Sequence, residues 1–198
     1  IKVIGIHKGP DFYKHLESGI FIGEVFTSDN INNYIIAEIN IKDEDVNKDI
    51  RIINSYEESI RKYPNDYWDE DKIYNNEEEI KKWEIKINNE IIPFNYFYKF
   101  KSKGKYIIKY SFNNNIRKAN FMFAYCDLLN KINLTYFNSN NVSNVISMFD
   151  KCSSLTNINL SNFNTNNIIN MFSLFSECSS LTNINLSNFN TNNVTDMS

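Results

Sequence analysis

The sequence predicts an α+β protein in which a small antiparallel β domain precedes a solenoid of repeats. Two observations support this prediction. Residues 116–198 repeat themselves every 26 residues, and a period of that length predicts stacked supersecondary units. Residues 33–115 hold no repeat but several runs of β-branched and aromatic residues. We therefore expect a sandwich-like β domain at 33–115, then a solenoid at 116–198 with a parallel concave sheet and short outer helices. The N-terminal segment, 1–32, is ambiguous.

The three cysteines reveal the repeat, because Cys126, Cys152 and Cys178 stand 26 residues apart. The sixteen residues that start at Cys152 read CSSLTNINLSNFNTNN, and the sixteen that start at Cys178 read the same. A more divergent copy, CDLLNKINLTYFNSNN, starts at Cys126. Chance does not produce this alignment. It frames three units and the start of a fourth: 116–141, 142–167, 168–193 and 194–198.

Each unit contains two hydrophobic periodicities. In 142–152 the apolar residues fall at offsets 0, 3, 6, 7 and 10, which at ~100° per residue predicts one face of a short helix. In 157–161 polar and apolar residues alternate, which predicts a short strand. Neither element can bury its apolar side alone. We therefore expect like side chains of successive units to form columns, with parallel strands about 4.8 Å apart.

The spacing of Leu155, Ile158 and Leu160 resembles the L-x-x-L-x-L pattern of leucine-rich repeats. More narrowly, CSSLTNINLSNFNTNN with its preceding Met-Phe resembles the BspA-like, 26-residue surface-protein class. This resemblance covers about 116–198. It implies a leucine-rich-repeat solenoid that acts in protein binding, attachment or scaffolding, with no catalytic residues to transfer. The first unit departs from the pattern, as expected near a cap, at Phe121, Lys131 and Tyr136.

The β domain is expected to cover the first repeat. Its strand-like runs are 34–42, 50–55, 83–88, 91–100 and 106–112. Two polar stretches, 88–90 and 102–104, predict hairpin turns. Segments 57–62 and 77–82 are each either a short helix or a loop. Ser55 stands at the position of an N-cap residue.

Composition limits the class of partner. The 198 residues are 42% hydrophobic and 23% charged, which is the balance of a soluble globular protein. The net charge of -3, with lysines interleaved with acids, argues against a nucleic-acid partner.

No segment approaches the ~18 apolar residues of a membrane span. Because the chain opens at Ile1 rather than Met and stops inside a repeat, we expect it to be a fragment.

No active site, metal site or cofactor motif follows from the spacing of reactive residues. Cysteines stacked in register point the same way, which is poor geometry for a disulfide or a zinc site, so we predict a buried thiol ladder. His7 and His15 lack a nucleophile motif and are interpreted as polar surface residues. The run from Asp43 to Asn47 begins like a calcium loop, but Lys48 stands where glycine is needed; a solvated loop is predicted.

We expect a protein-interaction module rather than an enzyme. Its binding surface would be the concave side of the predicted strands, which we call the strand face. The strand face consists of nine residues: Lys131, Asn133, Thr135, Asn157, Asn159, Ser161, Asn183, Asn185 and Ser187. This neutral, repetitive surface would contact an extended protein partner through many weak hydrogen bonds.

Alternatives stay open at several points. A structural surface spacer or adhesin segment is favoured by the identity of the sixteen-residue blocks, because a specialised site normally diversifies its exposed positions. An enzyme would require a polar cleft with a perturbed acid or base in the β domain. The many asparagines reflect either a biased genome or hydrogen-bonded ladders, such as Asn157 over Asn183. Acidic residues 66–71 form a docking patch or an exposed loop. Unpaired cysteines favour a reducing compartment, whereas the resemblance allows the cell surface.

Overall fold

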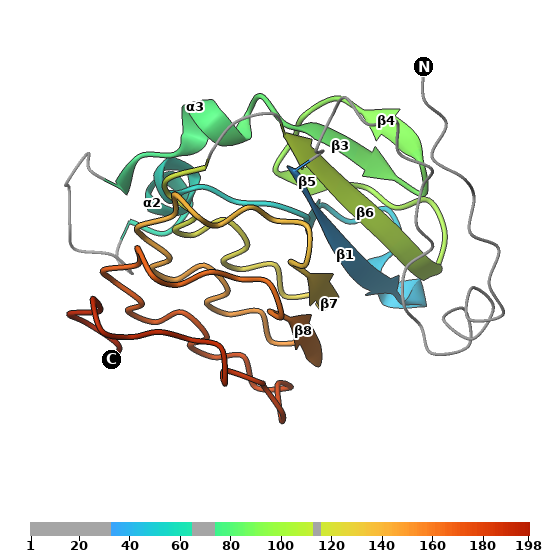
Figure 1. Ribbon diagram of the computed structural model, residues 1–198. Coiled ribbons are helices and arrows are strands. Elements are labelled where there is room, and N and C mark those ends of the chain that lie inside the picture. Colours follow the sequence, from blue (N-terminus) through green and yellow to red (C-terminus); the bar gives the residue numbers. More distant parts are fainter. Residues whose placement is uncertain (1–32, 65–73, 113–115) are drawn as a thin grey trace, which may run out of the picture. The chain divides into compact units, whose positions relative to one another are not determined.

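The computed structural model describes residues 33–64, 74–112 and 116–198 (Figure 1). The predictions for 1–32, with His7 and His15, and for the acidic residues 66–71 lie outside the described residues. In chain order the elements are β1 (Asn33–Ile41), the 3-10 helix η1 (Asp43–Asp45), β2 (Ile50–Arg51), α2 (Tyr56–Lys62), α3 (Glu77–Ile80), β3 (Glu84–Ile87), β4 (Glu90–Ile92), β5 (Phe97–Tyr98), β6 (Gly104–Phe112), β7 (Leu129–Asn133) and β8 (Asn157–Asn159).

The strand positions predicted between 33 and 115 are confirmed, since each of the five runs contains at least one strand. Ser55 caps α2 as expected, and its hydroxyl accepts a hydrogen bond from the Glu58 N–H at 3.1 Å. The turn between β3 and β4 is also confirmed. Asn88 and Asn89 both have positive φ, 47° and 71°, which is the backbone of a two-residue hairpin turn.

The second predicted hairpin turn, at 102–104, is wrong. β5 precedes it and β6 follows it, but these two strands do not pair. β5 pairs with β2, so that Ile50 lies opposite Tyr98. β6 lies between β3 and β1, which occupy both of its edges. The calcium-like run is an exposed 3-10 turn in which the Asp43 carboxylate pairs with Lys103 at 2.9 Å.

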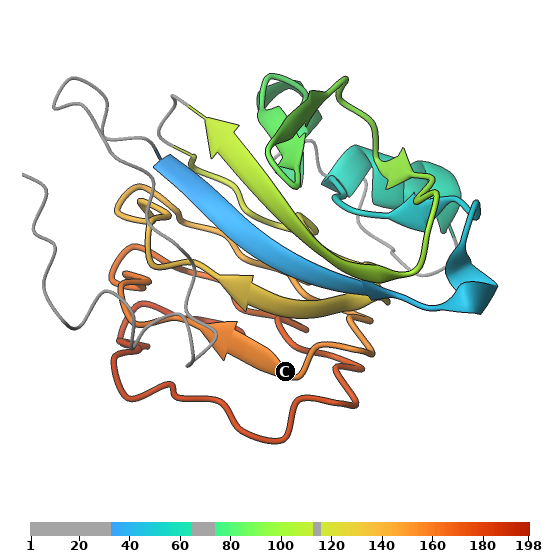
Figure 2. The same ribbon diagram turned by 90° about the vertical axis from the view of Figure 1, so that its right-hand side faces the viewer.

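The predicted fold class is wrong in two respects. The strands do not divide into a sandwich and a solenoid sheet; they form one mixed six-stranded sheet in the order β4-β3-β6-β1-β7-β8 and a separate two-stranded pair (Figure 2). In addition, the described residues of 116–198 contain no helix. The sheet is continuous because β7 of the first unit pairs antiparallel with β1, then parallel with β8. The division at 115/116 into two domains stays a prediction.

The segments predicted as outer helices are series of turns. Phe121 and Tyr125 have φ of 57° and 61°, a left-handed conformation that breaks any helix. The same two positions are left-handed in the next two units as well. Between them, the Ala124 N–H bonds to the Phe121 carbonyl at 3.1 Å, three residues back. Because the helix and this series of turns bring the same spacing of apolar residues inward, the periodicity did not distinguish them.

The other backbone groups of the turn segments explain why turns prevail. The Phe123 N–H bonds to the Met148 carbonyl of the next unit, and the Tyr125 N–H bonds to the Asp150 carbonyl, at 2.9 and 2.8 Å. In a helix, these backbone N–H and carbonyl groups would bond to one another within the same segment and not to the next unit. Helices also pack 8–10 Å apart, roughly twice the 4.7–4.9 Å spacing of strands, whereas turns bonded to one another match the strand spacing.

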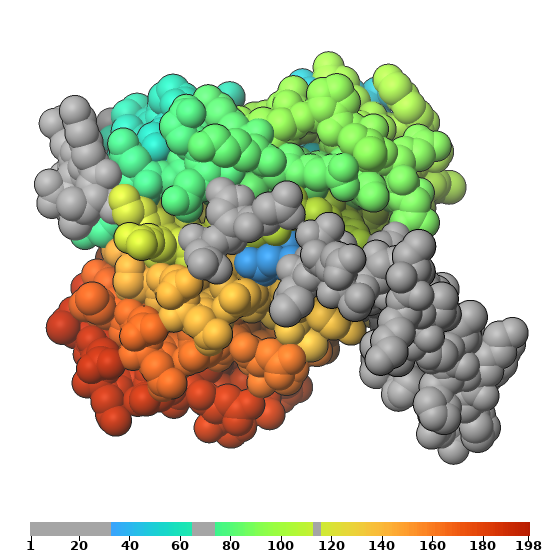
Figure 3. Space-filling model, turned by 45° about the horizontal axis from the view of Figure 1, so that its top comes forward, coloured from blue at the N-terminus to red at the C-terminus, as the bar shows by residue number. Residues whose placement is uncertain are grey.

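The predicted columns of like side chains are confirmed. The rings of Phe123, Phe149 and Phe175 stack at centroid distances of 5.8 and 5.6 Å. Phe137, Phe163 and Phe189 form a second column, at 5.9 and 6.1 Å. Backbone bridges join Lys118 to Asn144, Asn144 to Asn170 and Asn170 to Asp196. Figure 3 shows the successive units as layers that run from yellow to red.

A single hydrophobic core runs from the N-terminal strands into the repeats. Tyr110 of β6 lies edge-on to Phe123 of the first unit, with ring centroids 5.4 Å apart. The Tyr110 hydroxyl donates to the Ile52 carbonyl at 2.5 Å. Asn54, which is fully buried, donates from its side-chain amide to the Ala124 carbonyl at 2.8 Å. The N-terminal strands therefore cover the first repeat, as expected.

Candidate binding surfaces

The structure brings part of the predicted strand face together. Parallel pairing of β7 with β8 sets Lys131 opposite Asn157 and Asn133 opposite Asn159, so these four side chains share one face of the sheet. Residues 183–187 of the third unit are exposed and form no strand. The strand face is therefore a regular sheet surface across two units only.

β1 adds a charged row that sequence reasoning missed. Glu38 lies opposite Lys131 in the antiparallel register, and its side chain is 8% exposed. The Glu38 carboxylate is 3.6 Å from the Lys131 ammonium and 3.2 Å from the Lys105 ammonium. Lys131 is thus partly neutralised by its neighbour in the sheet. Only the pairing of distant strands reveals this, so no local sequence signal could have found it.

The strand-face asparagines are engaged by their own turns. The side-chain oxygens of Asn133, Asn159 and Asn185 accept the backbone N–H two residues later, at 2.9, 3.1 and 3.0 Å. This hydrogen bond fixes the side chain and uses its amide oxygen as an acceptor. A partner would therefore bind mainly to the side-chain NH₂ group. Asn133 is in addition only 8% exposed. A partner therefore has fewer hydrogen bonds to gain here than the residue types suggest.

Asparagine ladders between units do exist, but not where they were predicted. The Asn164 amide donates to the Asn140 side-chain oxygen at 2.8 Å, and Asn190 repeats this bond to Asn166, also at 2.8 Å. The predicted ladder of Asn157 over Asn183 does not occur among the described residues. The ladders form at the turns that end each unit, where side chains of successive units point along the stack.

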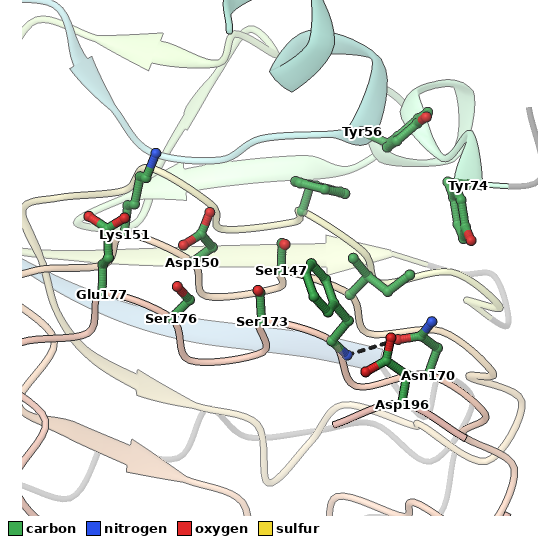
Figure 4. Close-up of a pocket in the computed structure, with 13 residues that line it drawn as sticks. Tyr56, Tyr74, Ser147, Asp150, Lys151, Asn170, Ser173, Ser176, Glu177 and Asp196 are labelled. Carbon is green, nitrogen blue, oxygen red and sulfur yellow. Dashed lines mark hydrogen bonds between the residues drawn. The ribbon is translucent and has the colours of Figure 1, made fainter. Parts of the chain in front are cut away.

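A second candidate surface lies on the opposite, turn-bearing side of the repeats. It is a cavity of about 580 Å³ between the α2–α3 region and the turn segments of the second and third units (Figure 4). We call it the turn groove. Its lining is formed by Tyr56, Tyr74 and Phe121, by residues within 146–151 and 170–177, and by Asp196.

The upper wall of the turn groove is aromatic. The Tyr56 ring lies 5.5 Å from the Tyr74 ring and 5.5 Å from the Phe121 ring, tilted to both. Ile146 and Phe172 stand at the same position of successive units, and Phe172 is 41% exposed. An exposed phenylalanine beside buried aromatic rings is the composition of a surface that takes an apolar group of a partner.

Carboxylates lie at both ends of the turn groove. In Figure 4, Asp150 and Glu177 stand toward one end and Asp196 toward the other. Lys151 is the basic residue of the lining, and its ammonium faces Tyr125, 4.6 Å from the ring centroid and 3.2 Å from the hydroxyl. Among the described residues, the lining therefore carries three carboxylates and one ammonium group, and that ammonium group contacts a neighbouring ring.

Ser147 lies in the middle of the turn groove. Its side chain is 1% exposed, and its hydroxyl has no hydrogen-bond partner among the described residues. Figure 4 shows this hydroxyl directed into the space below Tyr56. A buried polar group without a partner costs roughly 1–3 kcal/mol, so such a group calls for an explanation.

The repeats diverge at the turn groove. Ile146 is replaced by Phe172, Asp150 by Ser176 and Lys151 by Glu177 in the following unit. The sixteen residues after each of these segments are identical. Between the second and third units the strand-face side chains are thus constant, whereas three groove positions change in size or charge; Ser147 and Ser173, which also line the groove, are the same residue. Comparing the repeat units in the sequence shows which positions stay constant, but it does not show that the variable positions line one cavity.

A partly buried polar cluster anchors the helices above the groove. Glu77 at the start of α3 forms an ion pair with Arg61 of α2, and the Tyr96 hydroxyl donates to Glu77 at 2.6 Å. The hydrogen bond from Arg61 is the main cause that lowers the pKa of Glu77 to about 2. Burial, and then Glu77, raise the pKa of Tyr96. A carboxylate this well stabilised is a poor general base, so the geometry indicates a structural role.

The three cysteines are unpaired. Cys126 and Cys152 are buried, and Cys178 is partly covered. The thiols of Cys152 and Cys178 each donate to a carbonyl of the preceding unit at 3.1 Å. Burial raises the pKa of all three, that of Cys178 to about 11. These contacts match the predicted thiol ladder. Within 33–64, 74–112 and 116–198 no group of three His, Cys, Asp or Glu is placed to hold a metal ion.

Comparison with known proteins places the chain in a family. No curated protein and no solved structure matches it. In the part of the chain that the structure describes, no helix has the length and apolarity to cross a membrane. Residues 93–198, more than half of the chain, match the family described as "Mycoplasma protein of unknown function, DUF285". The match begins before β5 and therefore includes β6 as well as the repeats. The chain belongs to the DUF285 family.

Proposed function

We propose that this chain is a non-catalytic protein-interaction module of a BspA-like repeat protein, and that it binds its protein partner in the turn groove. The family match at 93–198 and the resemblance of the sixteen-residue blocks support the BspA-like assignment. The observation that carries the binding proposal is the divergence of the repeats at the groove. A surface that recognises a partner needs chemistry of its own, and at three groove positions the second and third units differ in size or charge.

The turn groove also has the better physical composition for binding. It combines aromatic rings, an exposed Phe172, carboxylates and the orphaned Ser147 hydroxyl within one concave space. Aromatic side chains in a concave site with a few polar groups are typical of binding hot spots. The strand face, in contrast, is repetitive, and its asparagine oxygens are occupied by turns. It remains a second candidate surface.

The experiment compares two matched variants in partner capture. Proteins from cells that produce this chain are cross-linked to the wild type, to Phe172→Ala and to the strand-face double variant Asn159→Asp with Asn185→Asp. We expect a protein that is enriched by the wild type to be lost with Phe172→Ala and retained with the double variant. Loss with the double variant alone would move the site to the strand face. No enrichment by any of the three would contradict the proposed binding function.

A structural spacer is the second candidate function. The identity of the sixteen-residue blocks and the ladder of Asn164 on Asn140 favour it, because both serve the stack rather than a partner. In that case the groove would be a by-product of the packing between α2 and the turns. The capture experiment separates the two functions, since a spacer enriches no protein through either surface.

A further inference from the structure

The polar side of the turn groove has the chemistry to hold a cation. Three carboxylates line the groove, and its ammonium group, that of Lys151, is turned to Tyr125. The groove therefore attracts a positively charged group, and does so through surfaces partly shielded from water, where charge interactions are stronger than at an open surface.

The position of Ser147 indicates which part of the groove would hold that cation. The Asp150 N–H bonds to the Ser147 carbonyl at 3.2 Å, so both side chains belong to one turn. Asp150 is only 6% exposed, and the Ser147 hydroxyl is buried without a partner. In Figure 4 both polar ends lie along the floor of the groove, with Asp150 toward the Lys151 end and Ser147 between it and the Tyr56 end. A donor at this place would satisfy the Ser147 hydroxyl and lie beside the negative charge of Asp150.

The geometry of the wall favours a guanidinium over an ammonium group. Tyr56, Phe121 and Phe172 line the groove on its apolar side. A guanidinium is planar, stacks on aromatic rings and carries five N–H donors in a fixed fork. An ammonium is a compact, strongly hydrated charge that loses more hydration free energy in such a space. A planar cation of this kind can donate hydrogen bonds to two acceptors and pack a face against an aromatic side chain at the same time.

We infer that the turn groove recognises an arginine side chain of an extended segment of the partner protein, with apolar residues beside that arginine. The guanidinium lies between the Asp150 carboxylate and the Ser147 hydroxyl, and the flanking apolar side chains pack against Phe172. This inference rests on the proposed function, because it names the chemistry of the partner for the same site.

The test uses a short synthetic probe and its neutral isostere. Acetyl-Leu-Arg-Leu-amide is titrated into the ¹⁵N-labelled chain and followed by NMR, alongside the same peptide with citrulline in place of arginine. Citrulline keeps the shape and removes the charge. We expect the arginine peptide to shift the amide signals of 146–151 and 170–177 and to bind about tenfold more tightly than the citrulline peptide, as expected for a charged hydrogen bond.

Two variants locate the contact. Asp150→Asn is expected to abolish the preference for arginine while the citrulline peptide binds as before. Ser147→Gly removes the hydroxyl and suits the positive φ of 49° at this position, and is expected to weaken arginine binding about threefold to tenfold. Glu84→Gln, at an exposed position of β3, is the matched control and should change neither affinity. Thermal melting of each variant shows that it is folded.

The outcomes separate the inference from the proposed function. Equal binding of the two peptides in the groove overturns the arginine inference and leaves the groove as a protein-binding site. Arginine-dependent shifts that map to the Glu38 region of the sheet also overturn it. No shift with either peptide at millimolar concentration overturns it as well. The proposed function itself is tested by the capture experiment, and it fails there if Phe172→Ala retains the partner or if none of the three proteins enriches one.

Discussion

The ring of Phe149 lies parallel to that of Phe123, with centroids 5.8 Å apart and planes that differ by 2°. These residues are equivalent in successive units, and Phe149 is 1% exposed. A column of rings through the turn segments holds the units in register, just as the parallel strands do on the other side. The turns behind the rings shape the floor of the turn groove.

Phe149→Ala tests the ring column. Removing a fully buried phenylalanine is expected to lower the free energy of unfolding by about 3–5 kcal/mol, because a cavity remains between Phe123 and Phe175. Phe172→Ala, in the same turn segment but 41% exposed, is the matched control and should cost about 1 kcal/mol or less. Urea denaturation measures both. Equal losses would show that the column does not carry the stability of the stack.

Asn164→Ala tests whether asparagines stabilise the stack. Asn164 accepts the Asn166 N–H at 2.9 Å and donates to Asn140 at 2.8 Å, so the substitution removes two hydrogen bonds. We expect a loss of about 1–2 kcal/mol in the free energy of unfolding, since each such bond contributes about 0.5–1.5 kcal/mol. Asn157→Ala, at an exposed strand position, is the control and should be nearly neutral. If both are neutral, the asparagine content has no structural role at this position.

Stability should fall in acid through Glu77. Its pKa is lowered from an ordinary 4.5 to about 2, so the folded state binds its proton less readily than the unfolded chain. The stabilisation is therefore complete above about pH 4.5 and is lost as the pH falls towards 2. After allowance for the half-exposed Arg61, we expect about 1–2 kcal/mol.

Glu77→Gln should remove this part of the pH dependence and lower stability at pH 7. Urea denaturation at pH 7, 4.5 and 3 compares the variant with the wild type. Glu84→Gln, whose side chain is 46% exposed, serves as the control. An unchanged difference between the wild type and Glu77→Gln across this range would contradict the assigned ion pair.

The cysteines should resist alkylation in the folded protein. Burial raises the pKa of Cys126 and Cys152 well above the ordinary value, and that of Cys178 to about 11. Only a thiolate reacts readily, so iodoacetamide at pH 8 is expected to modify all three cysteines slowly. Cys178 should be the first to react. Mass spectrometry before and after unfolding in urea measures this. Rapid labelling of Cys152 in the folded state would show that the thiol column is open to solvent.

The sequence predicted the columns of the stack but not the shape of the backbone. A strict period of 26 residues places Phe149 and Cys152 in columns whatever the local conformation, so their burial could be read directly. The helix prediction failed because most of the left-handed positions, such as Phe121, Tyr125 and Lys151, hold residue types that give no turn signal. Hydrogen bonds to the next unit, rather than local propensity, decide that conformation.

The candidate site was largely beyond sequence reasoning. The turn groove joins Tyr56, before the repeats, to Ile146 and Phe172 within them. In the sequence, segment 57–62 is either a short helix or a loop, so nothing there indicates that Tyr56 packs against a repeat unit. Likewise, the contact of Glu38 with Lys131 depends on an antiparallel pairing of β1 with β7 that no local pattern encodes.

Hydrogen–deuterium exchange of the chain with its captured partner distinguishes binding in the turn groove from binding on the strand face. We predict that the partner slows exchange in 146–151 and 170–177, the turn segments that line the groove, and leaves the strand segments 131–135 and 157–161 unchanged. Protection of the strand segments, with the turn segments unaffected, would contradict this prediction.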